Sequence, residues 1–448
     1  MEIKLSDNFT YKKLLRFTLP SIAMMIFTSI YGVVDGFFVS NFAGKTPFAA
    51  VNFIIPFLII LSTTGFMFGA GGSALIAKNM GEGDYQKANR IFSFLIYTSI
   101  VISIIIAILG FIFIEPIAAF LGAEGQLLSD SVLYGRIILI ALPAYVLQME
   151  FQSFFITAEK PKLGLAVTVA SGVTNMILDV LLVGVFPLGL VGAATATALS
   201  QTVGGLFPLI YFARKNNSPL RLTGAKFDGK ALAKTCSNGL SEFMNCIALS
   251  FLGILYNAQL LIYAGEDGVA AFGVIMYVSM VFSAIFMGYS VGCAPIISFH
   301  FGAQNKSELR SLLIKSLTVI GISSISMTLL SFILASPFSK LFVGYDEALL
   351  NLTIKGFFVY SLSFLFMGVA TFSSSFFTAL NDGVTSALIA FLRTLVFQTS
   401  AVILLPLIFD TDGIWWSLVV AESMAFTISF IFIFAKRKKF GYIKLSEL

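Results

Sequence analysis

The sequence predicts an all-α polytopic membrane protein with 12 transmembrane helices in two six-helix bundles. Three observations support this prediction: an apolar composition, twelve long apolar segments, and an internal repeat at about half the chain length. The chain has 448 residues, of which 58% are hydrophobic and 11% charged, with a mean hydropathy of +0.94. Soluble domains carry about 25% charged residues. The composition therefore excludes a chain of soluble domains.

Twelve segments are long enough to cross a bilayer, which takes about 20 mainly apolar residues. The segments of the first half are 13–40, 47–78, 90–115, 131–157, 163–186 and 189–213. Those of the second half are 234–263, 268–299, 312–337, 348–379, 384–408 and 413–435. Because the first segment is long enough to span, we interpret it as a retained helix and not as a signal peptide.

An internal repeat relates the two halves. At an offset of 221 residues, FQSFFITA at 151–158 aligns with FSSSFFTA at 372–379. The same offset also aligns seven single residues of the first half with identical residues of the second half. They are Gly44, Ala49, Ala50, Ser62, Gly71, Ile76 and Gly81, which align with Gly265, Ala270, Ala271, Ser283, Gly292, Ile297 and Gly302. Each unit holds an even number of helices, so both enter the membrane in the same direction. Parallel repeats of this kind are typical of alternating-access transporters. The predicted domains are residues 1–215, a cytoplasmic linker at 216–233, and residues 234–448.

Lysine and arginine residues predict the orientation, because cytoplasmic flanks of spans collect them. Most of the 28 cations flank one side when the N-terminus is placed inside, including the tail Lys436 to Lys439 and Lys444. The outer ends keep only Lys45, Arg136, Lys340 and Lys355. We therefore expect a multi-pass inner-membrane protein with both termini in the cytoplasm. This explains the basic pI of about 8.9 without nucleic-acid binding.

Motifs for other classes of function are absent from the sequence. The three cysteines are far apart, so no disulfide or zinc framework is expected. There is one histidine, His300, and no HExxH or GxSxG motif, so we expect neither an enzyme nor a bound cofactor. A passive channel would also fit the hydropathy, but it does not need a duplicated body with acids in one half.

Five acids lie inside predicted spans, where ionisable residues are rare and mostly functional. They are Asp35, Glu150, Asp179, Glu242 and Glu422. We interpret Glu150 and Glu422 as structural partners of Arg393 or of amides.

A cation site is predicted in the first half. At a rise of about 1.5 Å per residue, Asp35 and Asp179 reach the same outer level of the membrane. Asn175 lies one turn from Asp179, and Thr197 reaches a similar depth from the other side. Two carboxylates, an amide oxygen and a hydroxyl could hold Na⁺ or take protons. A buried structural network is the alternative.

The second half lacks these residues, because the repeat places Tyr256, Val396 and Ser400 at the equivalent positions. Helix 7 carries Glu242 instead, which could meet a cationic substrate or a proton.

The first helix contains three residues that permit bending or close packing. They are Pro20, Gly32 and Gly36. A charge change at Asp35 could therefore bias the shape of this helix.

Several motifs resemble those of the multidrug and toxic compound extrusion (MATE) transporters. They are VVDGFF around Asp35, NMILD at 175–179, GLVGAATATALS around Thr197, GEGDYQKANR, GAQNKSELR and TAEKPK. The resemblance implies a V-shaped fold that exchanges Na⁺ or H⁺ for amphipathic, cationic drugs. We also expect a monomer.

The resemblance further implies a cation site at Asp35, Asn175, Asp179 and Thr197, with Tyr31 and Tyr134 as candidate tyrosines, and it supports the role of Glu242. A carboxy-terminal cation site is not expected, since the family's helix 10 acid has no counterpart. The alternatives are a lipid or oligosaccharide-lipid flippase of the related superfamily and a major-facilitator transporter.

Overall fold

A computed structural model describes residues 3–442, apart from the side chains of Val33, Ala43 and Lys45. Lys444 and the side chain of Lys45, both used above to predict orientation, lie outside this description. In the first half the helices are α1 Tyr11–Phe38, η1 Val39–Ala43, α2 Lys45–Gly81, α3 Tyr85–Phe120, α4 Gly125–Thr157, α5 Pro161–Asp179, η2 Val180–Val185 and α6 Gly189–Ala213. In the second half they are α7 Gly229–Gly302, α8 Lys306–Val343, α9 Glu347–Ser361, α10 Phe364–Ala379, α11 Gly383–Phe391, η3 Leu392–Gln398, α12 Thr399–Leu404 and α13 Pro406–Phe440.

The helices account for all twelve predicted spans. Ten described helices are long and apolar enough to cross a membrane, or eleven when the bent pair α9 and α10 counts as one span. Helix α7 is a pair of spans joined at Gly265, where φ is +63° and the helix breaks. The span predicted at 348–379 is not one straight helix. It is broken between Ser361 and Phe364, and its two parts are bent by 45° relative to each other.

Helix starts follow the local capping chemistry. Asp84 accepts a hydrogen bond from the main chain of Lys87, and Asp228 accepts from Lys230 and Ala231. The Asp228 cap starts α7 at Gly229, so residues 229–233 of the predicted linker are helical. The segment between α6 and α7 is correspondingly shorter than the sequence suggested.

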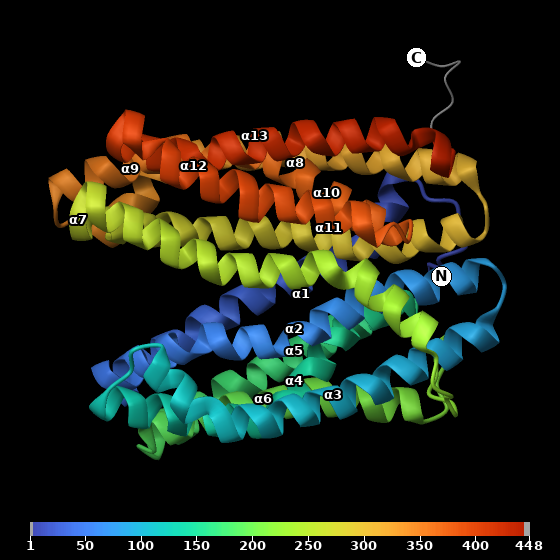
Figure 1. The fold of residues 1–448 in the computed structure, drawn as a ribbon, viewed down its shortest axis with the longest axis horizontal. Coiled ribbons are helices and arrows are strands. Elements are labelled where there is room, and N and C mark those ends of the chain that lie inside the picture. The colour runs from blue at the N-terminus through green and yellow to red at the C-terminus, as the bar shows by residue number, and fades with distance from the viewer. Residues whose placement is uncertain (1–2, 443–448) are drawn as a thin grey trace.

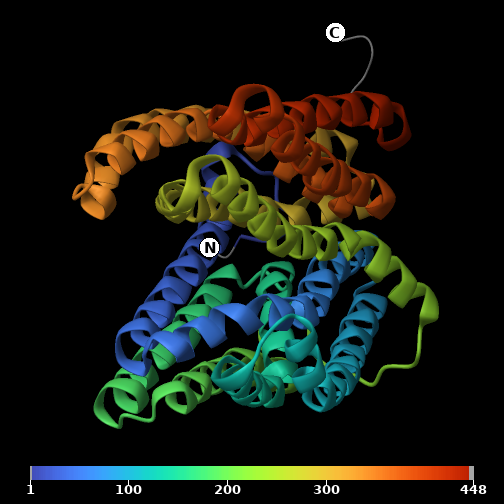
Figure 2. The same cartoon turned by 60° about the vertical axis from the view of Figure 1, so that its left-hand side comes forward.

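The two halves of the chain form two layers of helices. Figure 1 shows the first half, in blue to green, beneath the second half, in yellow to red. Figure 2 shows that α1 begins beside the second half and ends within the first. Gly288 and Gly292 of α7 make room for this crossing, because an added Cβ would lie within 3.2 Å of Ser21 or Thr18 on α1.

Reciprocal glycine contacts hold the two layers together at the end where the first and last described residues lie, here called the terminal end (Figure 1). A Cβ on Gly81 would lie 2.0 Å from the Phe299 carbonyl oxygen, and a Cβ on Gly302 would lie 2.0 Å from the Lys78 carbonyl oxygen. Gly81 and Gly302 are equivalent in the internal repeat. The main chains of the two halves are therefore in direct contact at these two equivalent positions. Only glycine permits this contact, because any side chain would collide with the opposite main chain.

Gly302→Val is expected to separate the layers at the terminal end, since the new side chain cannot fit against the Lys78 carbonyl. Spin labels on the exposed residues Glu82 and Gln304, in a variant without native cysteines, would report a longer distance. Gly321→Val is the control, because a Cβ there meets nothing within 4 Å. Equal distances in Gly302→Val and the control would contradict the role of this contact.

An N-terminal strap, residues 3–10, crosses between the layers at the same end. The Leu5 amide donates to Glu159 Oε1 of the first half at 2.7 Å, and the Phe9 amide donates to Glu308 Oε1 of the second half at 2.8 Å. Both apolar side chains are buried. The strap thus ties the two layers together through main-chain hydrogen bonds.

Candidate cation and substrate sites

Asp35, Asn175 and Thr197 come together from three helices of the first half. The Thr197 hydroxyl lies 3.4 Å from Asp35 Oδ1 and can donate to it. The Asn175 amide nitrogen lies 3.4 Å from Thr197 Oγ1. These long contacts bring together side chains of α1, α5 and α6.

Asp179 completes the set as the last residue of α5. Its side chain is fully buried, and neither carboxylate oxygen has a hydrogen-bond partner among the described residues. It lies close enough to Asp35 for direct electrostatic interaction. The π-helical turn η2 begins at the next residue, and π-helical turns occur frequently at functional sites.

Two tyrosines border the acids. Tyr134 on α4 is 3% exposed and interacts with the Thr197 hydroxyl and with both Asp35 and Asp179. Tyr31 lies one turn below Asp35 on α1 and interacts with it electrostatically. The structure therefore brings both candidate tyrosines to the carboxylate pair.

This arrangement offers oxygen atoms to a small cation. Two carboxylates, the Asn175 carbonyl oxygen and hydroxyl oxygens are the ligands that hard cations prefer. The Asn175 Oδ1 atom is buried without a hydrogen-bond partner in the described part of the chain. The same residues 3–442 contain no group of three or more His, Cys, Asp or Glu side chains placed for a metal.

The predicted bending residues lie in one continuous helix, α1. Pro20 is buried inside it, and a Cβ on Gly32 or Gly36 would meet nothing within 4 Å. Close packing thus does not explain these glycines in this structure. Bending of α1 at these residues stays a prediction.

Glu242 of α7 lies apart from the acids of the first half. Its side chain interacts with Asn245 one turn along and electrostatically with Arg393. On the same helix, Cys246 interacts with Thr63 of α2, so this part of α7 faces the other half. Glu242 therefore lies near the boundary between the layers.

Arg393 and Glu422 form a buried ion pair in the second half. The guanidinium donates from Nε to both carboxylate oxygens at 2.9 and 3.0 Å and from Nη1 to Thr371 at 2.9 Å. Gln398 adds a third donor to Glu422 at 3.1 Å. The sequence predicted this structural role for Glu422.

Glu150 has a different partner from the arginine or amide considered above. Its Oε2 atom accepts from Ser99 at 2.6 Å, and the side chain is fully buried. The hydroxyl of Ser99 was missed as a partner because serine carries little positional signal in a helix.

At the repeat-equivalent position of Asp35, Tyr256 bonds to Ser417 at 2.9 Å. The second half thus replaces an acid with a satisfied hydroxyl pair.

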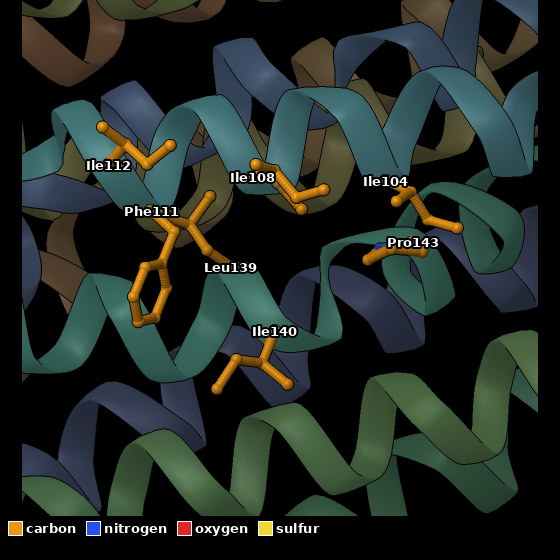
Figure 3. Close-up of a pocket in the computed structure, with 8 residues that line it drawn as sticks. Ile104, Ile108, Phe111, Ile112, Leu139, Ile140 and Pro143 are labelled. Carbon is orange, nitrogen blue, oxygen red and sulfur yellow. The ribbon is translucent and has the colours of Figure 1, made fainter.

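An apolar groove of about 310 Å³ between α3 and α4 is unrelated to these sites. Figure 3 shows its lining by Ile104, Ile108, Phe111 and Ile112 from α3 and by Leu139, Ile140 and Pro143 from α4. Several of these side chains, such as Ile140 at 74%, are exposed. On a membrane-spanning helix, such residues face lipid.

Comparisons with known proteins give one consistent result. The MatE family model matches residues 20–181 and 243–403. Multidrug export protein MepA of Staphylococcus haemolyticus (strain JCSC1435) is 26% identical over 98% of this chain and 97% of the relative. MepA of Staphylococcus aureus (strain MRSA252) is also 26% identical, over 98% and 96%.

The fold is likewise that of solved structures. An outward-facing conformation of a multidrug resistance MATE family transporter of the MOP superfamily superposes with a TM-score of 0.91 at 20% identity, covering 97% of this chain and 98% of the other. A MATE structure in the bent conformation superposes with a TM-score of 0.90 at 20% identity, covering 98% of this chain and 97% of the other. The arrangement of twelve helices in two bundles is thereby confirmed.

Proposed function

We propose, from the premise that this chain belongs to the MatE family, that it exports amphipathic cationic drugs in exchange for Na⁺ or H⁺. The chain is a multi-pass membrane transporter and not an enzyme. Members of this family are ion-coupled antiporters. Family membership excludes the major-facilitator alternative, and the curated relatives are described as multidrug exporters.

One observation carries the coupling proposal: the buried Asp179 carboxylate, whose two oxygens have no hydrogen-bond partner among the described residues, lies beside the half-buried Asp35 carboxylate. Two like charges at membrane depth repel each other and lose hydration, so a bound cation or proton relieves both effects. Asn175, Thr197, Tyr31 and Tyr134 add oxygens around the pair. An acidic site of this kind also disfavours the flippase alternative, for which a basic cavity is expected.

The terminal end of the molecule is the cytoplasmic end in this proposal. The cations that flank the spans gather there, as the positive-inside rule predicts. The glycine contacts then close the cytoplasmic side, so the structure corresponds to the outward-facing state. Both termini lie in the cytoplasm of an inner-membrane protein.

The transport cycle follows from these assignments. In the inward-facing state, a cationic drug enters between the bundles from the cytoplasm or inner leaflet and is held near Glu242. After the bundles rock to the outward-facing state, Na⁺ or H⁺ binds at Asp35 and Asp179 and favours drug release. Return to the inward-facing state carries the ion into the cytoplasm. The protein acts as a monomer, because each chain contains both bundles.

Ethidium efflux from vesicles with purified protein tests the proposed function. A sodium gradient and a pH gradient are imposed separately, and the one that drives efflux identifies the ion. Efflux that ignores both gradients would contradict antiport and would favour a channel or flippase.

Glu242→Gln is expected to weaken binding of cationic drugs by roughly tenfold, equivalent to about 1.4 kcal/mol, and to leave uncharged compounds unaffected. The substitution removes one negative charge near the boundary of the bundles while keeping the side-chain shape. Fluorescence titration with ethidium and with an uncharged dye measures the difference. Glu266→Gln, an exposed acid on the same helix, is the matched control. An equal loss for charged and uncharged dyes would argue against direct contact with the cation.

A further inference from the structure

The buried face of α5 is polar for much of its length. Asp179, Asn175, Ser171 and Thr168 follow each other at helical spacing, and each is at most 3% exposed. From Asp179 to Thr168 this row extends about 16 Å from the carboxylate pair toward the terminal end.

A side-chain amide of one neighbouring helix and a main-chain carbonyl of the other face this row. The Gln148 amide nitrogen of α4 lies 3.3 Å from the Ser171 hydroxyl, which in turn donates to the Ser200 carbonyl of α6 at 2.7 Å. Figure 1 shows α4, α5 and α6 side by side. The row thus packs against α4 and α6 within the first bundle.

Several side-chain amides of α4 and α6 are buried without a partner. Gln148 Oε1, Gln152 Nε2 and Gln201 Oε1 have no hydrogen-bond partner among the described residues, although each side chain is at most 8% exposed. A buried polar group without a hydrogen-bond partner destabilises a fold unless another interaction compensates for it. Gln148 and Gln152 line the same cavity, so two of these groups lie next to each other.

This small cavity continues the row toward the terminal end. It has a volume of about 10 Å³ and is lined by Gln148, Phe151, Gln152, Phe155, Gly164, Val167, Thr168, Gly204 and Pro208. This is about the room that one water molecule requires. Gly204 keeps the space open, because a Cβ there would lie 2.5 Å from Gln148 Cδ.

We propose that these residues form a polar passage inside the first bundle, through which the coupling ion moves between the Asp35–Asp179 pair and the cytoplasm. The passage is formed by Ser171, Thr168, Gln148 and Gln152. Its amide and hydroxyl oxygens suit Na⁺ and also suit a water chain that conducts protons. This inference rests on the proposed antiport function and adds an ion route separate from the drug route.

Aromatic rings close the passage at its cytoplasmic end. Phe155 lines the cavity and packs against Phe212 with ring centroids 5.2 Å apart. Phe151 stacks on the same ring at 5.6 Å. The ion therefore leaves only when these rings move, which prevents a continuous leak across the bundle.

Gln148→Leu and Thr168→Val test the passage in vesicles with a sodium or pH gradient. Each removes a polar group while keeping similar volume, and we expect the initial rate of coupled ion movement to fall at least about tenfold, as for the loss of one hydrogen-bonded link. Ion movement is followed with ²²Na⁺ or an internal pH dye. Thr328→Val, equally buried at 4% but on α8 of the second half, is the matched control. If Gln148→Leu does not fold, Thr168→Val alone provides the test.

A second readout separates the passage from the carboxylate pair. The dependence of ethidium binding on Na⁺ or pH stays normal in Gln148→Leu, because Asp35 and Asp179 are intact, whereas Asp179→Asn removes it. If ethidium efflux by the wild-type protein responds to neither the sodium gradient nor the pH gradient, the proposed function itself is overturned. Wild-type coupling with unchanged ion movement in Gln148→Leu and Thr168→Val overturns only the passage and leaves polar packing as its explanation.

Discussion

Asp179→Asn is expected to abolish ethidium efflux driven by the coupling gradient. The fully buried carboxylate has no hydrogen-bond partner among residues 3–442, so its charge is available to a cation or a proton. Asparagine keeps the shape and removes the charge. We expect the initial rate to fall at least about 100-fold, corresponding to about 2.7 kcal/mol. Efflux from vesicles under the driving gradient measures this loss.

Three comparisons make the result specific. Asp35→Asn should have the same effect, because the two carboxyls act on one ion. Asp130→Asn is the control, since Asp130 is a buried acid of the same bundle but bonds to Gln126 on its own helix. Ethidium should still bind to all three variants. Normal efflux by both Asp35→Asn and Asp179→Asn would place the coupling elsewhere, for example at Glu242.

Arg393→Met is expected to produce the largest loss of stability. It leaves the fully buried Glu422 carboxylate with Gln398 as its remaining hydrogen-bond donor among the described residues. Removing one partner of a buried ion pair typically lowers the free energy of unfolding by about 3–5 kcal/mol. Thermal unfolding of the purified protein in detergent measures the effect as a lower Tm.

Two further variants identify the buried charge as the cause. The double variant Arg393→Met with Glu422→Leu should recover most of the Tm, because no charge is then left unpaired. Lys355→Met, which breaks an exposed pair with Asp412, should change stability by less than about 1 kcal/mol. A Tm for Arg393→Met equal to that of Lys355→Met would refute this explanation.

The main architecture could be predicted from the sequence. The lengths of the apolar segments and the fixed offset of the repeat can both be read directly from the order of residues. The offset that aligned Gly81 with Gly302 also identified residues that meet across the bundles. The convergence of Asp35, Asn175 and Thr197 followed from helix rise alone, since depth in a membrane depends on distance along the helix.

Features that depend on helix rotation could not be predicted in this way. The meeting of Gln148 with Ser171 requires two helices to turn particular faces toward each other. Tyr134 was placed by resemblance only, because α4 is buried on several faces and shows no single apolar stripe. The break between Ser361 and Phe364 also lacks the proline or glycine that marks most kinks.

Hydrogen exchange at the N-terminal strap can report the motion of the two bundles during the transport cycle. Its Leu5 and Phe9 amide protons are each held by a carboxylate from a different bundle, so separation of the bundles at that end must release at least one of them to water. Their rate of exchange with deuterium would therefore report how much time the two bundles spend apart at the terminal end. A compound that holds the bundles together at that end would slow this exchange, without any label on the protein.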